Sequence, residues 1–256
     1  GRHRFNFMQT AAFNTADRET WGDLSSREAF VTGFDFDLNT KTRAWNANGT
    51  FVGSIVNPEP LPSDSTLSDK PKYGTGGEFT FARTAGVQRG NVGMRWESGK
   101  LELNDLGYLE APDEIVAYAW TQRRLNQGGK SKTFNSGNIN YNISKSWMYA
   151  GRKGLDTGTG DVAWSYGKGH PQYGNTNINA WAQFRNYREG WFGIQYNVEG
   201  HHRYETRGGP IMSEPATYGG WAGVSSDTRK NFYFTTEASY YRDTALNHST
   251  NGTFGV

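Results

Sequence analysis

The chain has 256 residues, and its 27 Lys and Arg against 25 Asp and Glu leave a formal net charge of +2, so charge gives no reason to expect a nucleic-acid partner. It contains no cysteine, which excludes disulfide frameworks, thiol catalysis and cysteine-based zinc sites. Aromatic residues make up 15% of the chain, although the hydrophobic total is only 35%. Aromatics spaced between polar residues are typical of membrane β-barrels, and they also fit an aromatic-rich soluble β-protein such as a glycan-binding sandwich.

Apolar and polar residues alternate with a period of two along most of the chain, and helical periodicity is nearly absent. In the segment 30–38, for example, Phe34 and Phe36 share one face, while Asp35 and Asp37 share the other, which we expect to be wet. Strands are predicted over residues 4–12, 28–39, 42–54, 73–83, 87–98, 113–127, 132–149, 174–186, 189–201, 216–226 and 229–242, and a twelfth begins near residue 250.

The predicted connections are of two kinds, which alternate along the chain. Short, turn-like connections lie at 39–42, 84–87, 126–131, 186–190 and 226–229, and long polar ones lie at 13–27, 55–72, 99–112, 150–173 and 202–215. Bacterial outer-membrane barrels combine tight periplasmic turns with longer extracellular loops. A soluble sandwich has no reason to alternate its loop lengths in this way. The pattern therefore predicts an all-β, antiparallel, up-and-down transmembrane β-barrel with the long segments outside the cell.

The two ends of the chain and its longest loop add to this interpretation. No run of about 18 apolar residues occurs, so no transmembrane helix is expected. The chain starts without Met or a signal peptide and stops within strand-like residues 253–256. We interpret residues 1–256 as one outer-membrane barrel segment of about 11–12 long strands, truncated at both ends, which should form a curved sheet that is open or partly closed. Residues 161–166 are interpreted as a hairpin-like excursion within the loop 150–173.

Two segments resemble motifs of a known family. Asn-Asp-Leu-Gly-Tyr-Leu at 104–109 resembles one loop motif, and Arg-Gly-Gly-Pro at 207–210, followed by Ser-Asp-Thr-Arg-Lys at 226–230, resembles another. Both occur in this order in a bacterial outer-membrane family catalogued as domain of unknown function 5916. The resemblance implies that this chain is a C-terminal barrel region, whose carbohydrate-binding, family-9-like N-terminal domain is absent here.

What the resemblance implies about function is limited. The barrel pattern predicts an outer-membrane pore, transporter or anchor in a Gram-negative bacterium, with membrane lipid as the partner. The family has no established activity to carry over, and the resemblance assigns any glycan binding to the missing domain. It also implies a set of family-typical loop residues without known chemistry, which are Asn104, Asp105, Gly107, Arg207, Gly208, Gly209 and Pro210.

Polar residues of the predicted lumen are the remaining candidates. Asp35, Asp37 and Glu199 are expected to face it, and an inward-folded Arg207 would pair with them and constrict a pore. The simpler interpretation of the loop around Arg207 is an external structural bend.

No catalytic chemistry is predicted. His201 and His202 follow Glu199 closely, but adjacent side chains on an extended chain point apart and no third metal ligand can be named. No nucleophile motif or recognisable carboxylate pair is present. We therefore assign no catalytic residue, cofactor or metal, and we do not expect this segment to be an enzyme. The competing hypothesis is a soluble glycan-binding or glycan-degrading β-protein, which predicts a buried core and a carboxylate-lined groove.

Overall fold

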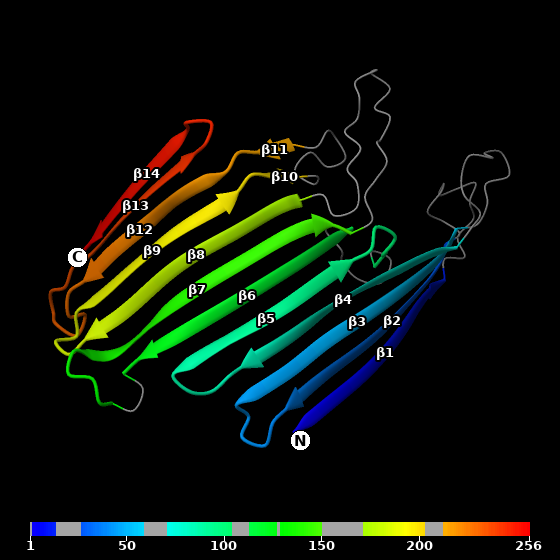
Figure 1. The fold of residues 1–256 in the computed structure, drawn as a ribbon, viewed down its shortest axis with the longest axis horizontal. Coiled ribbons are helices and arrows are strands. Elements are labelled where there is room, and N and C mark those ends of the chain that lie inside the picture. The colour runs from blue at the N-terminus through cyan, green and yellow to red at the C-terminus, as the bar shows by residue number, and fades with distance from the viewer. Residues whose placement is uncertain are drawn as a thin grey trace.

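The computed structural model shown in Figure 1 describes residues 2–13, 27–58, 71–103, 113–126, 129–149, 171–202 and 212–256. These residues form one antiparallel sheet of 12 strands and a separate two-stranded hairpin. The strands are β1 (His3–Phe13), β2 (Arg27–Asn39), β3 (Trp45–Pro58), β4 (Lys72–Arg83), β5 (Gln88–Glu97), β6 (Glu114–Leu125), β7 (Phe134–Met148), β8 (Pro171–Phe184), β9 (Glu189–Val198), β10 (Gly200–His202), β11 (Met212–Glu214), β12 (Thr217–Ser225), β13 (Thr235–Asp243) and β14 (His248–Gly255). The predicted all-β antiparallel class is confirmed.

Each of the twelve predicted strands corresponds to a strand of the large sheet. The largest difference is at β13, predicted from residue 229 but observed from Thr235. Residues 226–234 instead form a wide turn closed by a hydrogen bond from the Ser226 amide to the Phe234 carbonyl at 2.9 Å. The aromatic run 232–234 continues the strand pattern in the sequence, yet Phe232 lies in this turn with 88% of its surface exposed. The short β10–β11 hairpin was not predicted.

The topology is up-and-down, because the strands of the large sheet pair in the order in which they follow one another in the chain. Five short connections, those of β2–β3, β4–β5, β6–β7, β8–β9 and β12–β13, lie together at one end of the sheet, which we call the turn end (Figure 1). Four of them contain a residue with positive φ, which are Arg43, Gly86, Asn126 and Tyr187. The opposite end, the loop end, carries the β10–β11 hairpin and the short turn 244–247 between β13 and β14.

The sheet of the described residues is open, with β1 and β14 as its two edge strands. An open sheet was expected from the sequence. The N- and C-termini lie at opposite edges, both toward the turn end (Figure 1). In the described ranges no helix is long and apolar enough to cross a membrane.

One side of the sheet, here called the apolar face, carries large apolar side chains across nearly all the strands. A single row runs through Phe7, Phe34 and Phe51, which oppose one another on β1, β2 and β3. These rings are 68%, 40% and 42% exposed, so no described part of the chain covers them. Other members with similar exposure are Phe5, Phe79, Phe81, Val92, Met94, Ile139, Tyr141, Ile143, Ile178, Phe192, Ile194, Tyr196, Tyr218, Val224 and Tyr240.

The other side, here called the polar face, alternates with the first, as the pleat of a strand requires. The buried apolar residues form only a small core on this side. Val31, Val56, Leu101, Val116 and Met148 are each 7% exposed or less, and they lie near the loop end. Within the described residues, no second layer packs over the centre of the sheet, and its largest apolar surface is exposed.

Candidate functional site

The polar face is the candidate site, because it gathers the hydrogen-bonding and charged side chains of the strands. Asp35 and Asp37 both lie on it, next to β1. The Asp35 carboxylate accepts a hydrogen bond from the Asn6 amide at 2.6 Å, and Asp37 accepts one of 2.6 Å from Asn46. Arg4 approaches Asp37 at 3.6 Å, but its side chain is 70% exposed, so this ion pair contributes little.

The remaining predicted residues are not brought to the two aspartates. Glu199 is exposed between β9 and β10, and six strands of the sheet separate β9 from β2. The motif residues Asn104, Asp105, Gly107, Arg207, Gly208, Gly209 and Pro210 lie outside the described residues, so the pairing of Arg207 with lumen carboxylates stays a prediction. His201 and His202 are part of β10, opposite Ser213 and Met212. Within the described ranges, no three His, Asp or Glu side chains come together as a metal site.

A ladder of asparagines crosses β7, β8 and β9 at the centre of the polar face. Asn140 donates to Asn179 and Asn142 donates to Asn177, both at 2.8 Å. Along β8, Asn179 donates to Asn177 and Asn177 to Asn175, both at 2.9 Å. The bonds continue outward from Gln122 on β6 to Asn140 at 3.0 Å, and from Asn175 through Asn197 to Thr217 on β12. We call Asn138, Asn140, Asn142, Asn175, Asn177, Asn179 and Asn197 the amide ladder.

Sequence reasoning missed this ladder. Its signal is present as asparagine at every second position of 138–142 and 175–179. Each run places its amides on one face of a strand. Only the register shows that the two runs lie opposite each other, with Asn140 beside Asn179 and Asn142 beside Asn177.

Tryptophan rings flank the ladder on the same face. Trp191 on β9 opposes Gly223 on β12, and Trp221 on β12 opposes Gly193 on β9. A Cβ atom built on either glycine would overlap the indole opposite, so each ring lies across its glycine. This reciprocal arrangement needs glycine at both positions, and it fixes two large aromatic surfaces on the polar face. The Trp191 indole N–H donates to Glu237 at 2.5 Å, which sets the ring orientation.

On the other side of the ladder, β4 to β6 carry a charged group. Tyr118 lies across Gly93, and its hydroxyl donates to Glu78 and also contacts the Thr80 hydroxyl at 2.7 Å. Toward the loop end, Arg95 approaches Glu114 at 3.4 Å. The polar face is thus divided into a charged half over β2–β6 and a half over β7–β12 whose central side chains are uncharged, with Glu189 and Glu237 toward the turn end.

The first residues after β5 fold back over the polar face at the loop end, and we call residues 98–103 the strap. Leu101 is 3% exposed and lies against Gly74 and Gly76 of β4. The Glu102 amide donates to the Ser54 hydroxyl on β3 at 3.0 Å. The glycines are required there, because a Cβ atom at Gly74 would overlap the Leu101 backbone. The described part of the predicted external loop 99–112 therefore covers the polar side of β3 and β4.

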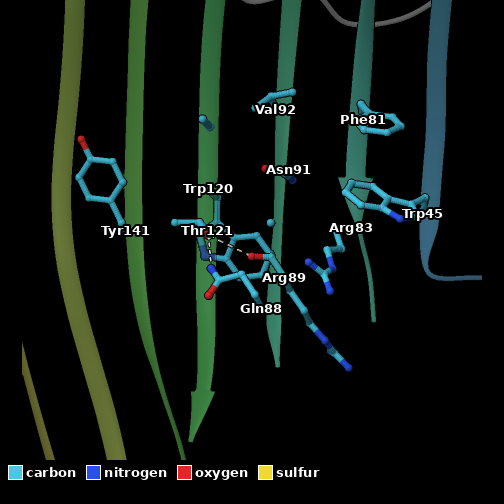
Figure 2. A pocket seen from close by; sticks show the side chains of 12 residues that line it. Trp45, Phe81, Arg83, Gln88, Arg89, Asn91, Val92, Trp120, Thr121 and Tyr141 are labelled. Carbon is cyan, nitrogen blue, oxygen red and sulfur yellow. Dashed lines mark hydrogen bonds between the residues drawn. The ribbon is translucent and has the colours of Figure 1, made fainter. Parts of the chain in front are cut away.

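A shallow depression lies near the turn end and is lined by aromatic and basic side chains (Figure 2). Trp45 and Phe81 stack with ring centroids 5.3 Å apart, and the Arg83 guanidinium lies 5.7 Å from the Trp45 ring. Gln88 and Thr121 are hydrogen-bonded at 2.5 Å beside them. Among the described residues that line it there is no Asp, Glu or His, so it offers no acid or base for hydrolysis.

The turn 226–234 contains the Ser-Asp-Thr-Arg-Lys segment singled out in the sequence. The Asp227 carboxylate accepts two 2.8 Å hydrogen bonds from the Arg229 guanidinium, and the Arg229 amide also donates to it at 3.1 Å. The guanidinium lies 3.1 Å from the centroid of the Tyr187 ring in the neighbouring β8–β9 turn. These contacts give the motif a structural role, because they join two turns of the turn end.

The Asp227–Arg229 contacts predict a measurable titration. The hydrogen bonds from Arg229 lower the pKa of Asp227 from 3.8 to about 2. A lowered folded-state pKa means that the stabilisation is present above the unfolded value and is lost as pH falls from 3.8 through about 2. NMR titration of carboxyl-labelled aspartate should show this low pKa, and Arg229→Gln should return it toward 3.8. A wild-type Asp227 that titrates at its ordinary value would contradict the geometry.

Comparison with known proteins gave one match. The model of the family described as Domain of unknown function (DUF5916) matches residues 9–255. No curated protein and no solved structure matches the chain.

Proposed function

We propose that this chain, which belongs to the family described as Domain of unknown function (DUF5916), forms part of the wall of a bacterial outer-membrane β-barrel. The apolar face would meet lipid and the polar face would line the lumen. The observation that supports this most strongly is the apolar face itself, whose large side chains are exposed on nearly every strand.

A soluble protein rarely carries a contiguous apolar surface of this extent. The distribution of charge on the same face adds to the argument. The Asp, Glu, Lys, Arg and His side chains on it lie within four positions of a strand end, and in the described strands they are His3, Glu28, Arg83, Arg123, Lys145, Arg242 and His248. Lipid-facing strands have this arrangement, since a charge costs most at the bilayer midplane and little at the interface.

The aromatic depression near the turn end fits an interface position. Trp45, Phe81 and Tyr141 line it together with Arg83 and Arg89. Amphipathic rings and basic side chains gather where hydrocarbon meets headgroups. With the short connections at the same end, the turn end would be the periplasmic one, as in other bacterial barrels.

A pore is the function that the polar face supports best. Its side chains would be wetted by the lumen, and the strap would narrow the lumen at the extracellular end. A membrane anchor for a periplasmic domain needs the same apolar face but no conducting path. Ion conductance of the purified protein in a planar bilayer separates these two roles.

Membrane association is the first test. The full-length protein should fractionate with the outer membrane, resist extraction by alkaline carbonate and be released by detergent, because the apolar face has to be covered. A periplasmic soluble protein from the same cells serves as the fractionation control. A full-length protein that is monodisperse in buffer without detergent would exclude a lipid-facing role and favour the soluble glycan-binding alternative.

A further inference from the structure

We infer that the amide ladder and the tryptophans beside it form a binding track for an uncharged, polyhydroxylated solute, such as a neutral oligosaccharide. The inference rests on the proposed function, because the track would line the lumen. It goes beyond that function by naming the chemical class of the solute and the residues that bind it.

The side chains of the track carry no charge themselves, and the carboxylates that contact it, Glu114, Glu189 and Glu237, bond to its ends at Ser146, Gln183 and Trp191. On the polar face, β7 from Asn138 to Ser146, β8 from Asn175 to Gln183 and β9 from Trp191 to Asn197 present amides, hydroxyls, indoles and one glycine. An anionic solute would lose hydration here without meeting a cation, which is costly, and the carboxylates at the ends of the track would repel it. The charged half over β2–β6 offers the contrast within the same wall.

The hydrogen-bonding chemistry matches hydroxyl groups. An asparagine amide supplies two donors and two acceptor lone pairs, and a sugar hydroxyl is likewise donor and acceptor. Asn175, Asn177 and Asn179 each donate one bond within the ladder, which leaves a second N–H on each for a solute. Amides at alternate strand positions repeat about every 6.6 Å, so a chain of similar units can meet one amide after another.

The tryptophans supply the apolar contact that such a solute also needs. Trp191 and Trp221 lie across glycines of the neighbouring strand, so each ring is supported from beneath by the sheet. Binding sites for small molecules combine aromatic surfaces with a few oriented polar groups. The Trp221 ring lies across Gly193, which pairs with Asn179 of the amide ladder on β8, so the C–H faces of a sugar could pack on the indole while its hydroxyls reach the amides.

The competing explanation is that the ladder only stabilises the sheet. The two roles separate in one experiment on the full-length protein in detergent, titrated with maltohexaose and followed by calorimetry and tryptophan fluorescence. Asn177→Leu removes the central amide, which bonds Asn142, Asn175 and Asn179. Asn48→Leu is the matched control, because Asn48 lies on the polar face of β3 in the charged half. Thermal unfolding shows that each variant is folded.

We expect the wild type and Asn48→Leu to bind maltohexaose in the millimolar range, and Asn177→Leu to bind about tenfold more weakly, as the loss of one or two hydrogen bonds predicts. Binding should be insensitive to salt, and a polyuronate of the same length should bind at least about tenfold more weakly. Absence of maltohexaose binding, equal weakening by both variants, or equal binding of the polyuronate would overturn the inference. Conductance without added sugar tests the pore separately. A protein that conducts ions but does not bind maltohexaose would therefore refute the binding track and leave the pore standing.

Discussion

Ile194→Arg should destabilise the protein folded in a lipid bilayer by about 2–4 kcal/mol, the cost of a basic side chain at the midplane of a barrel's lipid face. Ile194 lies at the middle of β9 on the apolar face, and 58% of its surface is exposed. In water, an exposed isoleucine of this kind would tolerate arginine within about 0.5 kcal/mol. The same substitution is therefore expected to destabilise the protein if lipid covers this face and to be nearly neutral if water does. Denaturant titration of protein refolded into lipid vesicles measures it.

Gln195→Arg is the matched control for this experiment. It is the next residue on the same strand, and the pleat places it on the opposite, polar face. We expect its free energy of unfolding to lie within about 0.5 kcal/mol of the wild-type value, since a charge facing water-filled space is hydrated. If Ile194→Arg were as mild as Gln195→Arg, lipid would not cover the apolar face and the barrel proposal would fail.

Gly74→Val should expel the strap from the polar face. A Cβ atom at Gly74 would overlap the backbone of Leu101, which cannot move aside without lifting the strap. Overpacking of this kind costs about 1–3 kcal/mol, and release of the strap also exposes the buried Leu101 side chain. Single-channel conductance should rise, because the strap would narrow the lumen at the loop end.

The strap position can be followed directly, because the chain has no cysteine of its own. The Glu102 amide lies 3.0 Å from the Ser54 hydroxyl, so cysteines introduced as Ser54→Cys and Glu102→Cys should form a disulfide. Adding Gly74→Val should abolish that disulfide. Gly33→Val is the control, because Gly33 also lies on the polar face. A Cβ atom at Gly33 would meet only the Phe51 carbonyl oxygen, at 4.0 Å. Unchanged cross-linking in Gly74→Val would show that the strap does not depend on this contact.

The strands and their two faces were predictable from the sequence, because period-two alternation is a local property of each segment. Phe34 and Asp35 are assigned to opposite faces by adjacency alone, and the structure places them so. The alternation of short and long connections then indicated which strand ends lie together. The start of β13 was predicted six residues too early. The aromatics at 232–234 continue the apolar pattern of the strand, but these residues belong to a turn that is closed by a backbone hydrogen bond between Ser226 and Phe234.

Contacts between distant segments were decided by the tertiary structure alone. Asn142 meets Asn177 only through the register of β7 and β8, and a shift of one residue would turn one run of amides to the other face. The position of Leu101 over Gly74 depends on a chain reversal after β5, which composition does not specify. The sequence by itself therefore determined which side chains face which way along each strand, and pairing between strands determined which of them meet.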